Sequence, residues 1–258
     1  MTKTETIDEV FARTLAGDYD DEAPWAAVRE LQGLGTREVF DRAAEWCTSV
    51  EPLKRARGAD VLAQLGRTSD QPGNNYPEDS FAVISSLIQI ETESRPLGSA
   101  IYASGHLGDP RALPFLVRYE NHSDAEIRFA LAFALGSFTS EATAVDVLVR
   151  LTRDEDEDVR DWATFGIGAL GKTDSPAIRD ALTGRLDDSF EDARQEAIVG
   201  LARLKDERVL PALLIALDQP KVPGIIVEAA IEMLGLSESE EAWTPARCAA
   251  GLRKKFGI

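Results

Sequence analysis

The chain has 258 residues, and its 45 Asp and Glu against 28 Lys and Arg give a formal net charge of −17. Hydrophobic residues make up 44% and charged residues 28%, as in an ordinary folded protein. The acidic balance disfavours nucleic acid and anionic membrane surfaces as partners, because both attract concentrated basic patches. No apolar run approaches the ~18–20 residues that span a bilayer, and the N-terminus holds no signal-peptide core. We therefore expect a cytoplasmic protein.

Cysteines and histidines are too few to predict a redox or metal centre. Cys47 and Cys248 lie near opposite ends of the chain and are expected to be small buried hydrophobes without a disulfide. His106 and His122 cannot supply a zinc site made of protein ligands. The chain also lacks a P-loop, a dinucleotide-binding glycine motif and a nucleophile elbow. The sequence predicts no catalytic residue, cofactor or metal.

The first predicted element is an N-terminal cap helix within residues 1–20. Its apolar face would be formed by Ile7, Val10, Phe11 and Leu15. An acidic run at 18–22 follows, and we interpret it, like the run at 154–158, as a solvated linker at a helix start.

A repeated unit then fills residues 21–236. Its clearest copy begins at Asp158 with Asp-Val-Arg, and further copies begin at Glu126 and Asp192. With the arginine of each copy set to offset zero, seven zeros follow one another at intervals of 31, 42, 31, 32, 34 and 33 residues. The zeros are Pro24, Arg55, Leu97, Arg128, Arg160, Arg194 and Val227. A unit of this length with one insertion predicts about seven stacked structural repeats.

Each unit is predicted to be a pair of helices. The first carries apolar or small residues at offsets −1, +3, +4, +7 and +10, a helical stripe. It ends near a glycine, which tolerates the left-handed conformation of a helix C-terminus. A turn such as Asp109-Pro110 leads to the second helix. A turn-rich insertion at 70–77 lengthens one unit, with Tyr76 as its candidate binding residue, and a C-terminal cap helix is expected within 237–258. The polar face of that helix would carry Arg247, Arg253, Lys254 and Lys255.

The unit Val-Arg-x-x-Ala-x-x-x-Leu-Gly-x-Leu-Gly resembles the short HEAT repeats named after the phycocyanobilin (PBS) lyases, over roughly residues 20–236. The resemblance implies an all-α fold, a right-handed α-solenoid of about seven HEAT-like helical hairpins with N- and C-terminal capping helices. It implies that the Val-Arg helices line the concave face. It also implies that the arginines at offset zero tie neighbouring repeats together, with Asp124, Asp158 and Asp192 as nearby acceptors.

Offsets +1, +2, +5 and +9 fall between the apolar ones and are expected to point outward. Offset +5 is charged at both ends of the array, with Arg29, Asp60 and Glu232, and aromatic in the middle. Offset +2 holds Arg57, Ser99 and Glu196 where one copy has Trp162. The alternative is that these rings pack between helices. We predict a partner-binding patch made of Tyr102, His106, Phe129, Phe133, Trp162 and Phe165.

Two classes of enzyme with similar helical-repeat scaffolds need residues that this sequence lacks. Di-iron hydroxylases need His-Glu pairs, but His106 and His122 are followed by Leu107 and Ser123. DNA glycosylases need a basic groove, which three outward arginines do not provide. We predict a non-enzymatic scaffold that binds another protein with an apolar anchor and a basic rim. The alternative is a bilin-lyase-like or other chromophore-handling or ligand-handling protein.

Overall fold

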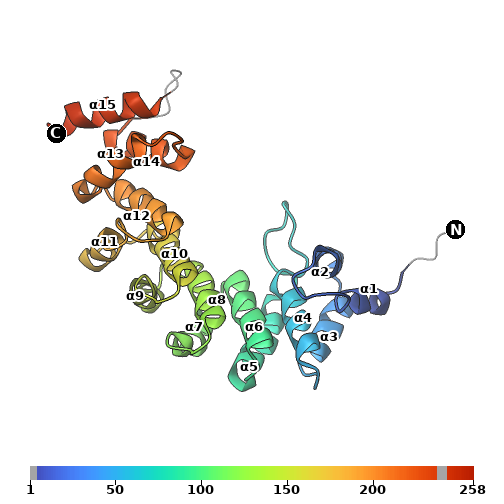
Figure 1. Ribbon diagram of the computed structural model, residues 1–258. Coiled ribbons are helices and arrows are strands. Elements are labelled where there is room, and N and C mark those ends of the chain that lie inside the picture. Colours follow the sequence, from blue (N-terminus) through green and yellow to red (C-terminus); the bar gives the residue numbers. More distant parts are fainter. Residues whose placement is uncertain (1–4, 237–242) are drawn as a thin grey trace. The chain divides into compact units, whose positions relative to one another are not determined.

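The computed structural model describes residues 5–236 and 243–258, and all regular structure in these ranges is helical (Figure 1). The predicted all-α architecture of helical hairpins is confirmed. The chain divides into two compact units, one up to Phe138 and one from Thr139, and each is described by itself. A single continuous solenoid across both units stays a prediction.

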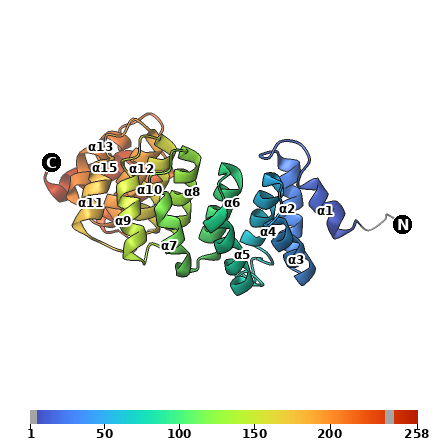
Figure 2. The same cartoon turned by 90° about the horizontal axis from the view of Figure 1, so that it is seen from below.

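In unit 1 the helices form an inner and an outer row. The inner row consists of α2 (Glu22–Leu34), α4 (Pro52–Ala63), α6 (Ser94–Leu107) and α8 (Ala125–Gly136). The outer row consists of α3 (Arg37–Trp46), α5 (Pro77–Ile90) and α7 (Leu113–Leu116), the last flanked by the 3₁₀ turns η1 (Pro110–Ala112) and η2 (Val117–Tyr119). Figure 2 shows α3 beside α4 and α5 beside α6. The inner helices are those with the arginine position of the repeat.

Unit 2 has the same two rows. Its inner row consists of α10 (Glu157–Phe165), which continues into the π-helical turn η3 (Gly166–Leu170), followed by α12 (Glu191–Arg203) and α14 (Gly224–Leu234). Its outer row consists of α9 (Ala142–Leu151), α11 (Pro176–Thr183) and α13 (Leu210–Leu217), which the 3₁₀ turn η4 (Glu207–Val209) precedes. The last helix, α15 (Pro245–Phe256), packs against α13 and α14.

Small residues let the inner helices approach closely. A Cβ atom added to Gly105 on α6 would lie 2.7 Å from the Cα of Ala134 on α8. One added to Gly200 on α12 would lie 2.8 Å from the Cα of Gly168. Neither distance is compatible with a side chain. The backbones of α6 and α8 in unit 1, and of α12 and η3 in unit 2, are therefore in direct contact.

The predicted glycine helix ends are confirmed in part. Gly35, Gly108 and Gly235 adopt φ of 58°, 66° and 70° directly after α2, α6 and α14. Gly136, the last residue of α8, and Gly171, which follows η3, also lie at helix ends, but neither has the expected left-handed conformation. The π-helical turn changes the end of that helix, so the left-handed residue is not required there.

Ile7, Val10 and Phe11 of the predicted N-terminal cap face lie on α1 (Ile7–Arg13), while Leu15 lies in the turn after it, and the predicted C-terminal cap residues lie on α15. Val10 and Phe11 are buried, and the Phe11 ring lies 4.8 Å from that of Trp46. On α15, Cys248 is buried, while Arg247, Arg253, Lys254 and Lys255 are exposed. Cys47 is buried as well, and both cysteines are free thiols, as predicted. Residues 237–242 of the predicted C-terminal cap lie outside the described residues.

The insertion at 70–77 folds back onto unit 1. The side chain of Asn75 donates to the carbonyl of Gly35 (2.7 Å) and that of Asn74 donates to the carbonyl of Leu62 (2.7 Å). The Tyr76 ring packs 5.4 Å from Phe40. Tyr76, the candidate binding residue of this loop, is therefore half-buried against the outer row.

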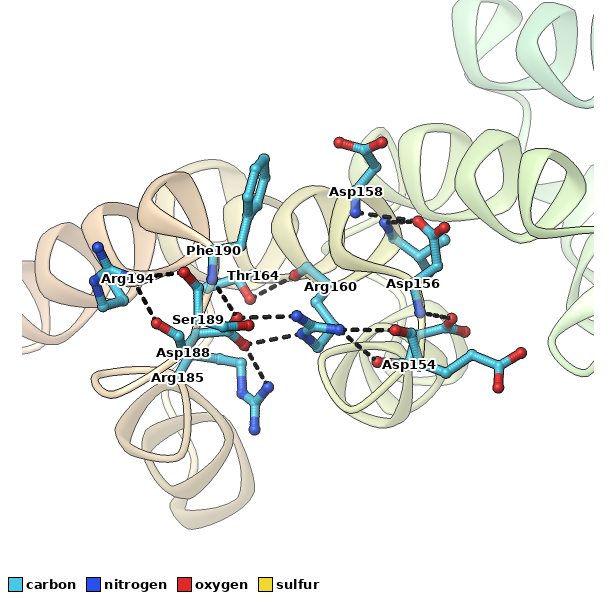
Figure 3. Close-up of polar contacts among 12 residues, drawn as sticks. Asp154, Asp156, Asp158, Arg160, Thr164, Arg185, Asp188, Ser189, Phe190 and Arg194 are labelled. Carbon is cyan, nitrogen blue, oxygen red and sulfur yellow. Dashed lines mark hydrogen bonds and ion pairs between the residues drawn. The ribbon is translucent and has the colours of Figure 1, made fainter.

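Two of the arginines at offset zero, Arg55 and Arg160, connect consecutive repeats, as the resemblance implied. Arg160 binds both carboxylate oxygens of Asp188 (2.9 and 3.0 Å) and donates to the carbonyls of Asp154 and Glu155 (Figure 3). Arg55 binds Glu91 in the same bidentate way, at 2.6 and 3.0 Å.

The expected acceptors need correction. The carboxylates that receive Arg55 and Arg160 belong to the next repeat, since Glu91 and Asp188 follow these arginines by 36 and 28 residues. Within the described residues Arg160 makes no ion pair with Asp158, the expected acceptor, because its guanidinium binds Asp188 and the carbonyls of Asp154 and Glu155. Arg194 donates to the carbonyls of Asp188 and Ser189, and Arg128 to that of His122. Carbonyls are the shared acceptors because the chain turns toward the arginine just before each inner helix.

Within the described ranges, none of the helices is both long and apolar enough to cross a membrane.

Candidate functional site

Four of the six predicted binding residues form one cluster on helices α6 and α8 of unit 1. The Tyr102 ring meets those of Phe133 and Phe129 edge-on, with centroids 5.1 and 6.4 Å apart. His106, one turn along α6 from Tyr102, lies 5.3 Å from Phe133. All four side chains are half-buried. Their neighbours fix the rings while part of each ring stays in solvent. We call these four residues the α6/α8 aromatic cluster.

The other two predicted residues lie on α10 of unit 2. The rings of Trp162 and Phe165 meet edge-on, with centroids 5.6 Å apart, and both side chains are half-buried. These two rings are therefore neither fully buried between helices nor fully exposed to solvent. A single patch formed by both units, and its role in binding, stay predictions.

A pocket of about 710 Å³ lies along the inner row of unit 1 and includes part of the aromatic cluster. Its lining comes from α2, α4, α6 and α8 and from the segment between α1 and α2. The aromatic part of the lining consists of Tyr19, Trp25, Tyr102, His106 and Phe133. The volume falls in the range of about 300–1,000 Å³ that suits a small ligand or an inserted side chain.

One side of the pocket rests on a buried polar network. The hydroxyl of Tyr19 donates to Asp60 Oδ2 (2.5 Å) and lies 2.8 Å from the Ser99 hydroxyl. Beneath them, Arg57 Nη1 donates to Asp60 Oδ2 (3.2 Å). The Arg57 guanidinium also stacks on the Tyr19 ring at 3.8 Å. The network joins the α1–α2 segment to α4 and α6, so it fixes the ring of Tyr19 in the pocket wall.

The structure corrects the expectation that offsets +2 and +5 point outward throughout the array. Arg57 is 0% exposed, and Asp60 and Ser99 are also buried. The reason is that the segment after α1 crosses over α4: Arg57 Nε donates to the carbonyl of Thr14 (2.9 Å) and Nη2 to that of Tyr19 (2.7 Å). The N-terminal segment thus covers the face of α4 that would otherwise be open.

Burial sets the protonation of the pocket groups. It raises the pKa of Asp60, although the hydrogen bond from Tyr19 and the charge of Arg57 oppose the rise. It also raises the pKa of Tyr102, with the negative charge of Glu126 acting in the same direction. Burial lowers the pKa of His106, so its imidazole is neutral at pH 7. Tyr102 and His106 therefore offer uncharged rings to a ligand.

The inner row of unit 2 holds two carboxyl groups with raised pKa values. Burial raises the pKa of Asp161 to about 6, and the negative charge of Asp192 adds to the rise. Burial and the charge of Asp161 raise the pKa of Glu196 to about 7. The Oδ1 atom of Asp161 is buried without a hydrogen-bond partner in the described part of the chain. Unit 2 thus holds two carboxyl groups, on α10 and α12, whose negative charges repel each other.

Sequence reasoning missed the other residues of the pocket wall. Tyr19 was placed in a solvated acidic linker, yet it is half-buried and its hydroxyl contacts groups 41 and 80 residues away. The guanidinium of Arg95 also lies over the Tyr19 ring, 4.4 Å from the ring centroid. An aromatic residue inside a charged run was a signal that this linker is not fully solvated. Trp25, at the start of α2, carried no comparable signal.

Comparison with known proteins supports the fold. The family model described as HEAT repeats matches residues 87–168 and 165–235. The chain is 30% identical over 233 residues to protein YibA of Escherichia coli strain K12, an alignment that covers 88% of this chain and 80% of that protein. The X-ray structure of E. coli YibA superimposes with a TM-score of 0.73 at 26% identity, covering 97% of this chain and 93% of that one.

Bilin lyases are the second group of relatives. The phycocyanobilin lyase subunit alpha of Thermosynechococcus vestitus is 29% identical over 106 residues, which cover 41% of this chain and 38% of that protein. The complex of CpcE and CpcF of phycocyanin lyase from Nostoc matches in fold alone, with a TM-score of 0.51 at 15% identity over 98% of this chain and 95% of that one. The resemblance seen in the repeat motif is confirmed: the chain belongs to the HEAT-repeat family, among the proteins whose repeats are like those of the phycocyanobilin lyases.

Proposed function

We propose that this protein is a non-enzymatic scaffold whose inner rows bind a protein partner through the α6/α8 aromatic cluster and through Trp162 and Phe165. The supporting observation is that all six predicted rings are half-buried. Partly exposed rings held by neighbours are typical of binding anchors, because little side-chain freedom is lost when a partner covers them. Helical repeats commonly bind along such extended surfaces.

A chromophore is the second candidate, because the relatives include a phycocyanobilin lyase subunit. The pocket is large enough for an organic ligand. A bilin carries propionate carboxylates, however, and the lining holds four carboxylates against one guanidinium. Like charges in a partly buried pocket repel, so this lining favours a partner without negative groups. We expect no change in the absorbance of free bilin on mixing with the protein. A red shift with a defined stoichiometry would support the chromophore instead.

The test of the proposed function is affinity capture with variants in each unit. Phe133→Ala and Trp162→Ala, singly and together, are expected to reduce recovery of a protein captured by the wild type. Ile90→Ala and Ile215→Ala are matched controls, since these residues are 77% and 65% exposed on outer helices of the same units. Equal recovery by all variants would contradict the proposed surface.

A further inference from the structure

The pocket of unit 1 has an excess of negative charge at its lining. Its carboxylates are those of Asp20, Asp60, Asp124 and Glu126, and its guanidinium is that of Arg95. Arg57 beneath the wall compensates Asp60 at 3.2 Å, and Arg95 lies 3.9 Å from Asp20. Asp124 caps α8 by accepting from the backbone N–H of Glu126, and the charge of Arg128 stabilises it, which leaves Glu126. The Glu126 carboxylate makes no ion pair within the described ranges and is close enough to Tyr102 to raise the pKa of its hydroxyl.

Aromatic faces stand beside these carboxylates. Tyr102 and Phe133 line the pocket, and the neutral His106 extends the same wall. The faces of such rings attract cations, most strongly the flat guanidinium group, which can stack and still donate hydrogen bonds at its edge. A ring with an adjacent carboxylate can therefore stack on the plane of an arginine guanidinium and accept hydrogen bonds from its edge.

The protein already uses this combination inside its own fold. The Tyr19 ring has the guanidinium of Arg57 at 3.8 Å and that of Arg95 at 4.4 Å. Arg57 is at the same time paired with Asp60. In the same pocket, Tyr102 on α6 provides an aromatic ring and Glu126 on α8 provides a carboxylate.

We propose that this pocket receives an arginine side chain from a basic segment of the protein partner. The proposal rests on the proposed function and specifies the chemistry of the partner. The geometry that supports the proposal is the shared lining of one pocket by Tyr102, Phe133 and Glu126.

The test uses a fluorescently labelled, amidated octapeptide of alternating arginine and alanine, with its anisotropy measured at 150 mM salt. A second peptide has citrulline in place of every arginine, which keeps the shape and removes the charge. The arginine peptide is expected to bind at least tenfold more tightly than the citrulline peptide. Glu126→Gln and Tyr102→Ala are each expected to weaken its binding by roughly threefold to tenfold.

Glu38→Gln is the matched control, because Glu38 is an exposed carboxylate on the outer helix α3. It removes the same charge away from the pocket, and its binding is expected to equal that of the wild type. Glu126 is exposed, so its substitution tests the pocket even if Tyr102→Ala perturbs folding. Equal binding of both peptides, or equal effects of Glu126→Gln and Glu38→Gln, would overturn the proposal. If protein capture still depends on Phe133 and Trp162 in that case, the scaffold function stands and the arginine pocket alone is wrong.

Discussion

Replacing Arg57 with methionine is expected to destabilise unit 1 by about 3–5 kcal/mol, the usual cost of removing one partner of a buried ion pair. The side chain is 0% exposed. Its loss leaves the Asp60 carboxylate with the Tyr19 and Ser99 hydroxyls as neighbours but without a positive charge. It also leaves the carbonyls of Thr14 and Tyr19 without their donors. Methionine keeps most of the side-chain volume, so the loss of charge and hydrogen bonds dominates over a cavity.

Urea denaturation followed by circular dichroism and tryptophan fluorescence measures this effect. With m-values of about 1–3 kcal/mol/M, the expected loss lowers the midpoint of unit 1 by about 1 M or more. Trp25 reports directly on the site, since the Arg57 guanidinium lies 5.0 Å from its ring. The two units can unfold separately, so both probes are needed to assign the transition.

Two further variants show whether the reasoning is right. Adding Asp60→Asn to Arg57→Met removes the isolated charge and keeps an acceptor for Tyr19, so the double variant is expected to be more stable than Arg57→Met alone. Arg29→Ala removes an exposed arginine paired with Glu22 and is expected to cost less than about 1 kcal/mol. If Arg57→Met costs no more than Arg29→Ala, the network does not fix the N-terminal segment.

The remaining predictions concern both units. Hydrogen bonds from Arg160 lower the pKa of Asp188 to about 2. Unit 2 therefore has this stabilisation fully above pH 4 and is expected to lose it as the pH falls from 4 to 2. The variant Asp188→Asn is expected to remove this pH dependence from the unfolding temperature measured in thermal scans. The raised pKa of Glu196, about 7, means that the folded unit takes up a proton more readily than the unfolded chain, so stability falls as the pH rises from about 4 to 7. Glu196→Gln is expected to flatten this fall and to stabilise unit 2 at pH 8, by only on the order of 1 kcal/mol because solvent screens its repulsion with Asp161. Gly105→Ala is expected to lower the urea midpoint of unit 1, since the new Cβ would lie 2.7 Å from the backbone of α8; an unchanged midpoint would show that the inner helices can separate.

The repeat made much of the fold predictable from the sequence. The stripe at offsets −1, +3, +4, +7 and +10 fixes which face of each inner helix is buried, and the arginine at offset zero was correctly assigned a structural role. Both are local properties: the apolar stripe recurs along the array, and the arginine recurs in the copies at Arg55, Arg128, Arg160 and Arg194. The acceptor of Arg160 was misidentified because Asp188 lies 28 residues away, in the following repeat. A motif of a dozen residues contains no information about that contact.

The candidate site was predictable only where the repeat surface is left uncovered. Tyr102 and Phe133 were found because the column that contains them becomes aromatic in the middle copies. Asp60 occupies the same column and is buried, since a segment outside the repeat crosses it. The contact between Tyr19 and Ser99 joins residues 80 positions apart. Exposure at a repeat position depends on such long-range cover, which the helical pattern does not encode.

The distribution of positive charge explains why the inner surface is acidic. Arg55 and Arg160 are paired with carboxylates of neighbouring repeats, and Arg57 holds the N-terminal segment, so these guanidinium groups serve contacts within the fold. The chain has 45 acidic residues against 28 basic ones, so the carboxylates in excess have no internal counterparts. Some of this excess lies near aromatic rings, as where Glu126 and Tyr102 line the same pocket. A partner that covers these rings must bring positive charge with it, because covering unpaired carboxylates with an apolar or acidic surface would cost desolvation energy without compensation.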